Sequence, residues 1–172
     1  TTFNKYSDAP DGPLVEKGAA AQVLREGNTG TGTATQAVNR TMLTVKDGAF
    51  VPFSAANSGL DEHLVKFIRG EDVNNEKRDG QLTKTRPSIH GDVIHSRPLP
   101  VNYGSGGVTV YYGANDGTLR AVNAENGTER WAFVAPEFFS RLSRIENNLR
   151  RTRHRGTILV GGRTGAFTGF MM

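Results

Sequence analysis

The apolar positions in the first half of the chain predict two helices. Residues 14–26 (LVEKGAAAQVLRE) gather their apolar side chains on one side of a helix. Residues 58–69 (SGLDEHLVKFIR) place theirs at the i, i+4, i+7 and i+8 spacing of a single helical face. Asn57 or Ser58 is expected to cap this second helix. Gly70 is expected to end it, because glycine accepts the left-handed backbone of a helix C-terminus.

Turn residues and polarity predict the two segments on either side of the second helix. Residues 41–53 (TMLTVKDGAFVPF) contain two apolar runs around Asp47-Gly48, a pair that favours a tight β-hairpin. Residues 71–87 (EDVNNEKRDGQLTKTRP) are almost wholly polar. We therefore expect a hairpin before the second helix and an exposed loop after it.

From residue 88 the pattern changes to short strands. Prolines at 98 and 100 exclude a helix at the start of this region. Three runs rich in β-branched and aromatic residues follow, at 108–113, 118–122 and 128–134. They are separated by the turns Asn115-Asp116-Gly117 and Asn126-Gly127, whose residues favour tight hairpins. This half therefore predicts a three-stranded β-meander.

The meander is followed by a helix and a second strand pair. Residues 136–149 (PEFFSRLSRIENNL) are amphipathic, with Pro136 at the start, where a helix tolerates proline. Residues 157–172 again predict strand, Gly-rich turn and strand. Residues 112–122 and 160–170 share one order of apolar, Gly, small and polar positions at an offset of 48 residues. Such a period favours β-propeller blades, which bury their faces by stacking.

Composition supports a chain of short extended segments. Of 172 residues, 21 are Gly and 7 are Pro, and apolar residues make up 36%. The absence of Cys excludes disulfides and Cys-ligated metal sites, and no run approaches the roughly 18 apolar residues of a membrane-spanning helix. Thr1–Asn4 lack the features of a signal peptide and residue 1 is not Met, so we expect a piece of a longer protein.

The positive charge is local. The net charge is +4, but residues 141–172 carry seven Arg and one Glu, a net of +6, so residues 1–140 sum to −2. The cluster at 150–155 is a candidate for binding nucleic acid or another anionic surface. Because the cluster has no interleaved aromatic residues, it is better explained as a surface group of Arg without a binding role or as the product of a frame disruption. We expect no nucleic-acid partner.

The meander resembles a blade of the quinoprotein type. In such blades a turn that ends in Gly is followed four residues later by Trp, and in residues 110–134 (VYYGANDGTLRAVNAENGTERWAFV) these positions are Gly127 and Trp131. The resemblance implies that Trp131 docks between neighbouring blades, and we expect Val110, Tyr112 and Phe133 to pack as well. The positions of the structural blade motif are Gly113, Asp116, Gly117, Gly127 and Trp131.

Segments around the meander narrow the resemblance. FIRGED at 67–72, GDVIHSRP at 91–98 and PEFF at 136–139, together with EKGAAAQVLRE at 16–26, resemble the PilC/PilY family of type IV pilus tip-associated proteins. The resemblance covers roughly residues 10–146 and weakens from Asn147. Family members are much longer, usually with a von Willebrand-like domain and a complete seven-bladed propeller.

The resemblance implies a mainly β fold, an incomplete quinoprotein-like β-propeller of one to two blades preceded by an irregular linker with short helices. The expected parts are an irregular linker region with a short helix and a hairpin at 1–57, a helix and polar loop at 58–87, and a partial propeller at 88–172. The last divides into a blade at 88–135, a helix at 136–149 and an incomplete second blade at 157–172.

The implied function is that of a non-enzymatic fragment of a type IV pilus biogenesis and tip adhesin protein, supporting pilus assembly, adhesion and twitching motility. The implied location is outside the cell, at the cell surface or pilus tip and associated with the outer membrane. Partners would be pilin, minor pilins and a host or surface receptor, contacted through residues 71–87, 115–117 and 126–127. The alternative is a fragment of a quinone-dependent (PQQ-type) oxidoreductase, although two blades cannot enclose a quinone and no catalytic motif is present.

Two sets of candidate metal ligands stand out. Asp72, Asn74, Glu76 and Asp79 place oxygen atoms as in a calcium loop. The loop lacks Gly at its sixth position and Glu at its twelfth, so a solvated loop is the preferred reading, with calcium possible in the full-length protein and no cofactor expected in this chain. His90, Asp92 and His95 could form a second set, but an extended backbone turns His95 away from the other two.

Overall fold

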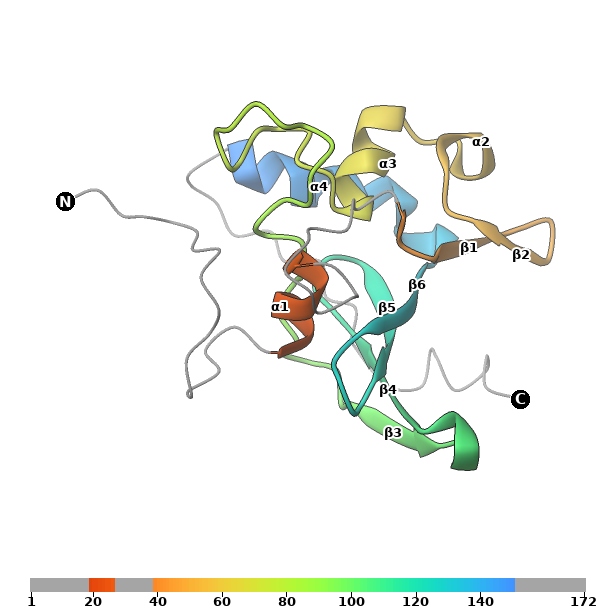
Figure 1. Cartoon of the computed structure of the whole chain (residues 1–172). Coiled ribbons are helices and arrows are strands. Elements are labelled where there is room, and N and C mark those ends of the chain that lie inside the picture. Colours follow the sequence, from red (N-terminus) through yellow and green to blue (C-terminus); the bar gives the residue numbers. More distant parts are fainter. Residues whose placement is uncertain (1–18, 27–38, 151–172) are drawn as a thin grey trace.

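A computed structural model describes residues 19–26 and 39–150 (Figure 1). The described chain is mainly β, with a few short helices, and its strands form one open sheet. In chain order the elements are α1 (Ala19–Glu26), β1 (Met42–Lys46), β2 (Ala49–Pro52), α2 (Ala55–Ser58), α3 (Glu62–Arg69), β3 (Leu99–Asn102), the 3-10 turn η2 (Gly104–Gly106), β4 (Val108–Gly113), β5 (Thr118–Asn123), β6 (Glu129–Val134), the 3-10 turn η3 (Pro136–Phe138) and α4 (Phe139–Arg150).

The six strands lie in the order β2-β1-β6-β5-β4-β3. Strands β3 to β6 form an antiparallel meander, which confirms the three predicted strands and adds β3 as a fourth. The hairpin of β1 and β2 joins this meander through a parallel pairing of β1 with β6. Segments about 90 residues apart in sequence, Met42 and Ala132, are therefore neighbours in the sheet.

Local turn chemistry accounts for the confirmed hairpin. Asp47 and Gly48 connect β1 to β2 with φ of 52° and 76°. Positive φ at both central residues defines the type I′ turn, whose twist matches that of the two strands. The Asp-Gly pair thereby fixes the register in which Lys46 faces Ala49.

The second predicted helix exists, but its predicted cap was wrong. Residues 55–58 form the separate short helix α2, which ends at Gly59 with φ of 71°. Asp61 caps α3 instead, because its carboxylate accepts the backbone N–H groups of His63 and Leu64 at 2.9 and 3.3 Å. Gly70 ends α3 with φ of 103°, as predicted.

The other predicted helices lie where the pattern placed them. α1 covers the second half of the segment 14–26, whose first part lies outside the described residues. α4 follows a 3-10 turn opened by Pro136. The second blade at 157–172, the repeat copy at 160–170 and the arginine cluster at 150–155 fall outside the residues whose side chains are described. In the described part of the chain, no helix has the length and apolar character needed to cross a membrane.

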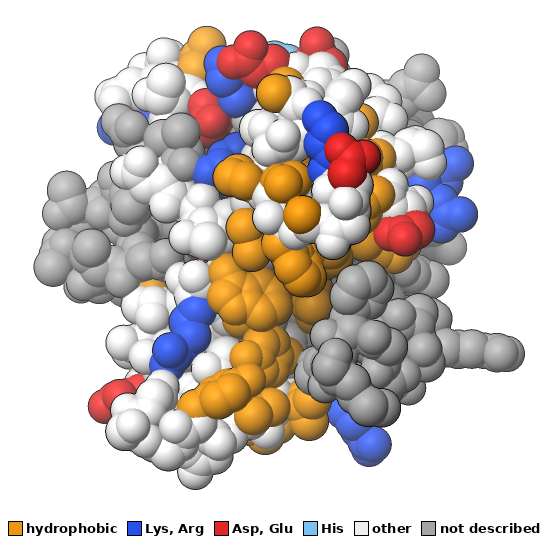
Figure 2. Space-filling view, turned by 90° about the vertical axis from the view of Figure 1, so that its right-hand side faces the viewer, with side chains coloured by type: hydrophobic (Ala, Val, Ile, Leu, Met, Phe, Trp, Pro, Cys, Tyr) orange, Lys and Arg blue, Asp and Glu red, His pale blue; other side chains and the backbone are white. Residues whose placement is uncertain are grey.

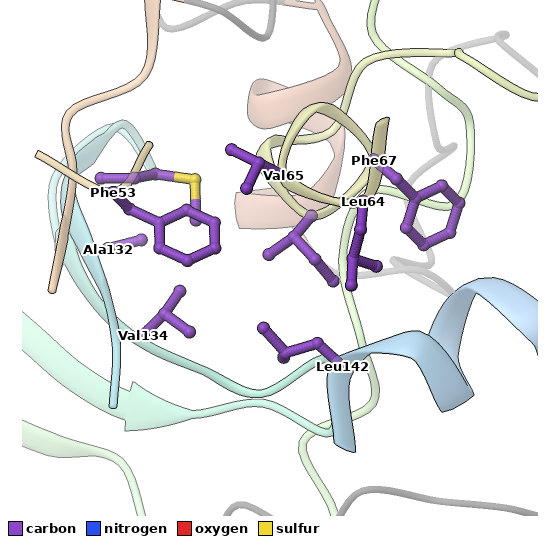
Figure 3. Packing of buried hydrophobic residues seen from close by; sticks show 9 residues of the cluster. Phe53, Leu64, Val65, Phe67, Ala132, Val134 and Leu142 are labelled. Carbon is purple, nitrogen blue, oxygen red and sulfur yellow. The ribbon is translucent and has the colours of Figure 1, made fainter. Parts of the chain in front are cut away.

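Helices α3 and α4 pack on one face of the sheet to form the hydrophobic core (Figure 3). Met42, Ala132 and Val134 contribute the sheet side of this core, since cross-strand neighbours in a sheet point to the same face. Leu142 of α4 is fully buried on this side, and Phe67 of α3 is fully buried on the side of the helix that points away from the sheet. We call this side of the sheet the covered face.

The opposite side, the apolar face, is partly exposed. Cross-strand pairs place Leu99, Tyr111 and Trp131 in one row across it, and Leu119, Phe133 and Leu43 in the next. Phe50 of β2 lies edge-on to Phe133 and is 64% exposed. In Figure 2, which views the side where β1 and β2 lie in Figure 1, apolar side chains form a continuous stripe.

Proline blunts both edges of the sheet. Along β2, successive residues direct their backbone N–H and C=O groups alternately toward β1 and away from it. Because Phe53 N–H donates to Met42 O, the groups of Phe50 and Pro52 point outward. The bond from Tyr103 N–H to Gly107 O does the same for β3, where Pro100 and Asn102 point outward. Each edge strand therefore offers a single outward N–H, a poor template for a further strand.

Two glycines that end helices allow a test of how closely Ile89 packs against the end of α3. Gly59 and Gly70 both end helices with positive φ, but a Cβ at Gly59 would meet nothing, whereas a Cβ at Gly70 would overlap the side chain of Ile89. Gly59→Ala should cost about 1 kcal/mol of unfolding free energy, from backbone strain alone. Gly70→Ala should cost a further 1–3 kcal/mol, roughly, from overpacking.

Urea denaturation monitored by circular dichroism measures both free energies. Equal losses for the two variants would contradict the close packing of Ile89 against Gly70.

Candidate functional site

The loop proposed to hold calcium folds around one buried carboxylate. Asp72 is buried, and its two carboxylate oxygens accept the backbone N–H groups of Glu76 at 2.6 Å and Lys77 at 3.0 Å. Asn75 and Asp79 similarly accept backbone N–H groups of Gly80 and Gln81. These bonds hold the loop in a compact turn. The prediction of a fully exposed loop was therefore wrong at its ends, where Glu71, Asp72, Thr85, Arg86 and Pro87 are buried.

Glu76 points back into the protein. Its Oε2 accepts the Ser88 hydroxyl at 2.7 Å, and its Oε1 lies 3.7 Å from the Arg86 guanidinium. Among the described residues, no group of three or more His, Asp or Glu side chains is arranged to hold a metal ion. Calcium binding by Asp72, Asn74, Glu76 and Asp79 stays a prediction.

Arg86 anchors the end of this loop on α3. Its guanidinium lies 4.0 Å above the ring of Phe67 and donates to the Phe67 carbonyl at 3.2 Å. It also donates to Ser88 O and Oγ at 2.5 and 2.7 Å. Burial lowers the pKa of Arg86 to about 10, against the opposing effect of Glu76, so the side chain remains charged at neutral pH. Loop and helix are thereby held together by a buried cation.

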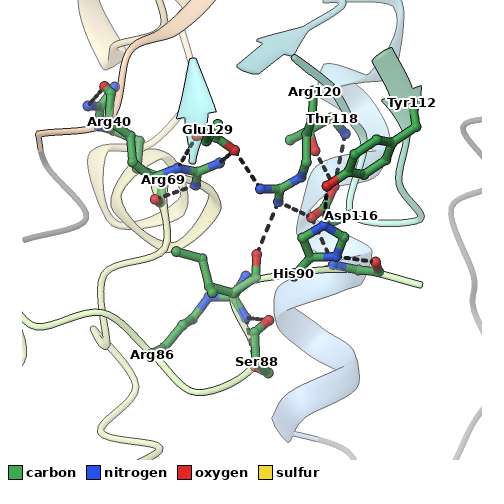
Figure 4. A network of polar contacts seen from close by, with 12 residues as sticks. Arg40, Arg69, Arg86, Ser88, His90, Tyr112, Asp116, Thr118, Arg120 and Glu129 are labelled. Carbon is green, nitrogen blue, oxygen red and sulfur yellow. Dashed lines mark hydrogen bonds and ion pairs between the residues drawn. The ribbon is translucent and has the colours of Figure 1, made fainter. Parts of the chain in front are cut away.

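The most distinctive feature of the structure is a buried row of alternating charges, Arg40, Glu129, Arg120 and Asp116 (Figure 4). Arg40 makes a two-pronged contact with Glu129, from Nε to Oε1 at 2.8 Å and from Nη2 to Oε2 at 2.9 Å. Arg120 reaches Glu129 at 2.7 Å and Asp116 at 2.6 Å through its two terminal nitrogens. We call these four side chains the charge row.

The charge row ties the meander to the segments that precede it. Arg120 also donates to Ile89 O at 3.2 Å, and Asp116 accepts the backbone N–H of Gly91 at 2.9 Å. Arg40 donates to Arg69 O at 2.6 Å, and Arg69 returns a bond to Arg40 O at 2.8 Å. The region predicted as a linker is thus bonded to the sheet through buried charged groups.

Each charge in the row fixes the ionisation of its neighbours. Burial would raise the pKa of Asp116 and of Glu129, but Arg120 lowers both, helped by Arg40 at Glu129, and both pKa values lie below their ordinary range. Burial would lower the pKa of Arg120, but Asp116 and Glu129 outweigh it and raise that pKa. All three groups are therefore fully charged at neutral pH.

His90 stands beside the charge row and is held in one tautomer. Its Nδ1 lies 2.7 Å from Gly91 O, which can only accept, so Nδ1 carries the proton. Its Nε2 then accepts the hydroxyl proton of Tyr112 at 2.8 Å. Asp92 is exposed but its backbone carbonyl accepts Asn115 N–H at 2.9 Å, and His95 is exposed. The three residues proposed as a second metal set therefore play different roles.

The residues of the predicted blade motif lie at the ends and turns of the meander. Asp116 accepts both the hydroxyl and the N–H of Thr118 at 2.5 and 3.1 Å, which closes the turn between β4 and β5. Gly113 ends β4, and Gly117 and Gly127 take positive φ in their turns. Trp131 is half-buried on the apolar face, with its ring centroid 5.7 Å from that of Tyr111.

The three elements proposed as contact sites differ in accessibility. The turn Asn126–Gly127 projects from the meander with Asn126 exposed. Residues 78–83 of the polar loop are also exposed. Asp116 and Gly117, by contrast, are buried, Asp116 against Gly91 and Gly117 against Leu142 of α4. Of the proposed contact elements, the turn at 115–117 is therefore mostly in contact with other parts of the protein and not with solvent.

Comparison with known proteins gives one similar sequence. The chain is 29% identical over 105 residues to the type IV pilus biogenesis factor PilY1 of Pseudomonas aeruginosa (strain UCBPP-PA14). The match covers 47% of this chain and 8% of that protein, so the chain spans only a small part of its length. No family model matches the chain, and no solved structure matches it. Part of the chain is therefore similar to a protein of type IV pilus biogenesis.

Proposed function

We propose that this chain is part of a type IV pilus-related protein of the PilC/PilY kind, exported to the cell surface, where it acts by contact and not by catalysis. The observation that carries the proposal is the similarity to PilY1. The order of FIRGED, GDVIHSRP and YGANDG along the chain supports it independently of overall identity. The whole protein would support pilus assembly and surface adhesion.

The proposed structural role of the chain is to supply one blade of a quinoprotein-like β-propeller. A propeller blade is a four-stranded sheet, and β3 to β6 form a four-stranded antiparallel meander. Since α3 and α4 cover one face, a neighbouring sheet would stack on the apolar face, where Leu99 is 47% exposed and Trp131 is half-buried. The blunted edges favour growth of the structure by stacking over growth by strand addition.

The stacking proposal predicts a difference between the intact protein and this chain alone. Trp131→Ala should destabilise the intact protein by about 3–5 kcal/mol, as expected for a large side chain in a packed core. In the 172-residue chain the loss should be smaller, because the side chain is only half-buried there. Chemical denaturation of both proteins measures the two losses.

Leu82→Ala is the matched control, since Leu82 is exposed in the polar loop and away from the sheet. It should cost less than about 0.5 kcal/mol in either protein. An equal loss for Trp131→Ala in the two proteins would overturn the stacking of a neighbouring sheet on the apolar face.

The proposed partners are pilin and minor pilin subunits. Surface plasmon resonance with purified subunits tests this, using the intact protein and a variant with Lys77→Glu and Arg78→Glu in the polar loop. Weaker binding by the variant, with unchanged stability, is expected if this loop makes the contact. Absence of binding by the intact protein would contradict the pilus role, and dye-linked quinone-dependent turnover would contradict the non-enzymatic one.

A further inference from the structure

Residues 90–96, which we call the latch segment, lie on the sheet through polar contacts. Gly91 N–H donates to Asp116 Oδ2 at 2.9 Å, Asn115 N–H donates to Asp92 O at 2.9 Å, and Gly113 N–H donates to Ser96 Oγ at 2.8 Å. None of the latch residues belongs to the hydrophobic core formed by α3, α4 and the sheet. The segment is thus attached by hydrogen bonds to the ends of β4 and the turn that follows.

The latch segment has a firm boundary on its N-terminal side. Ile89 is 1% exposed and fills the space beside Gly70, and Arg86 is bonded to Phe67 and Ser88. Beyond this anchor, Val93 and Ile94 are exposed, with 39% and 64% of their surfaces accessible. Opening of the segment would therefore break few apolar contacts and would leave the core intact.

His90 occupies the contact between the latch segment and the sheet (Figure 4). Its ring lies between Gly91 O and the buried Tyr112 hydroxyl, with one nitrogen donating and the other accepting. The charged groups around it come from the turn, β5 and β6, namely Asp116, Arg120 and Glu129. Arg120 already takes both carboxylates as partners, so neither is free to accept a new bond from the imidazole without weakening the charge row.

Protonation of His90 conflicts with this arrangement. An imidazolium donates from both nitrogens, so Tyr112 would have to give up its bond to Nε2 and accept one instead. The new charge would also be buried beside Arg120. Burial, followed by repulsion from Arg120, lowers the pKa of His90 to about 4, against the opposing effects of Asp116, Glu129 and the Gly91 carbonyl.

We propose that the latch segment is an acid-sensitive switch: neutral His90 holds residues 90–96 on the β4–β5 turn, and protonation of His90 releases them from the sheet while the core remains folded. Release frees the backbone N–H groups of Gly113 and Asn115 and one carboxylate oxygen of Asp116. The switch does not depend on the pilus-related role.

Proton linkage gives the direction and the size of the change in latch opening with pH. In the open state His90 would titrate at its ordinary value of 6.5, so the open state binds more protons than the closed state between pH 6.5 and 4. Opening is therefore favoured as the pH falls through this window. The opening equilibrium constant should rise about 20-fold between pH 7 and pH 5. Asp116 does not contribute in this range, because its pKa is below its ordinary value of 3.8 when closed.

Amide hydrogen exchange of the 172-residue chain, followed by NMR and corrected for intrinsic rates, tests the switch. The N–H groups of Gly91, Gly113 and Asn115 should open more readily than those of Phe53 and Ala132, which are bonded within the β1, β2 and β6 part of the sheet. Their opening constants should rise about 20-fold from pH 7 to pH 5.

Two histidines in the same segment provide the matched variants. His90→Gln should abolish the pH dependence of the three latch amides, whereas His95→Gln, at an exposed position, should retain it. Retention of the pH dependence in His90→Gln, its loss in His95→Gln, or latch amides as protected as Phe53 and Ala132 would each overturn the proposal.

Should His90→Gln fail to fold, the ring signals of His90 in the unmodified chain decide the matter. A titration midpoint near 4, with latch amides opening as the pH falls toward it, supports the switch. A midpoint near 6.5 with unchanged latch amides, or any titration that leaves these amides closed, overturns it.

Discussion

Glu129→Gln is expected to destabilise the fold by about 3–5 kcal/mol, because it removes one partner from a buried ion pair. The Glu129 carboxylate is shared by Arg40 and Arg120, and all three side chains are at least 96% buried. The amide keeps the shape of the side chain but loses its charge. Two guanidinium groups would then lie close together with Asp116 as the only remaining anion of the row.

Equilibrium urea denaturation at pH 7 measures this loss. Glu125→Gln is the control, since Glu125 makes the same charge change at an exposed position in the β5–β6 turn. It should alter stability by less than about 0.5 kcal/mol. A loss below 1 kcal/mol for Glu129→Gln would mean that the charge row contributes little to holding the preceding segments on the meander.

Phe67→Ala should destabilise the chain by about 3–5 kcal/mol, the usual cost of removing a fully buried aromatic ring. Phe67 is 0% exposed, and its ring supports the Arg86 guanidinium. Removal of the ring leaves a cavity beneath the Arg86 guanidinium. It also takes away the surface on which a buried cation rests, which adds to the cost.

Phe50→Ala makes the same change on the apolar face. Phe50 is largely exposed and has one aromatic neighbour, Phe133, so its loss should be at most about 1.5 kcal/mol. Thermal or urea denaturation of both variants gives the comparison. Similar losses at the two positions would contradict the placement of the core on the covered face alone.

Turn chemistry and helical period were sufficient to predict most of the local elements. Asp47-Gly48 specifies its hairpin and Gly127 the turn between β5 and β6, because few other residues adopt positive φ at low cost. The apolar face of α3 was visible in its spacing. Its first residue was not, because Asn57, Ser58 and Asp61 are all residue types that favour a helix N-cap; in the structure Gly59 ends α2 and Asp61 caps α3.

Long-range pairing could not be predicted from local pattern. The parallel contact of β1 with β6 joins residues about 90 apart, and nothing in either strand identifies the other. It attaches the β1–β2 hairpin, which lies in the region expected as a linker, to the end of the meander. The same limit applies to the covered face, whose helices come from both sides of the meander in sequence.

The charge row was also missed, although one signal was present. Arg120 lies in a strand whose neighbours Leu119 and Ala121 are apolar, so a charged side chain there must meet either solvent or a partner. Its partners Asp116 and Glu129 lie in the same meander and were within reach of such reasoning. Arg40 was not, since it comes from outside the meander and 89 residues away from Glu129.

The prolines at positions 52 and 100 have a consequence for crowded surroundings. A protein present at high local concentration can aggregate when the edge strand of one molecule pairs with the edge strand of the next. With one usable donor on either edge, such pairing gains almost no backbone bonding per added molecule. In the described part of the chain, self-association by strand pairing is therefore disfavoured at both edges of the sheet.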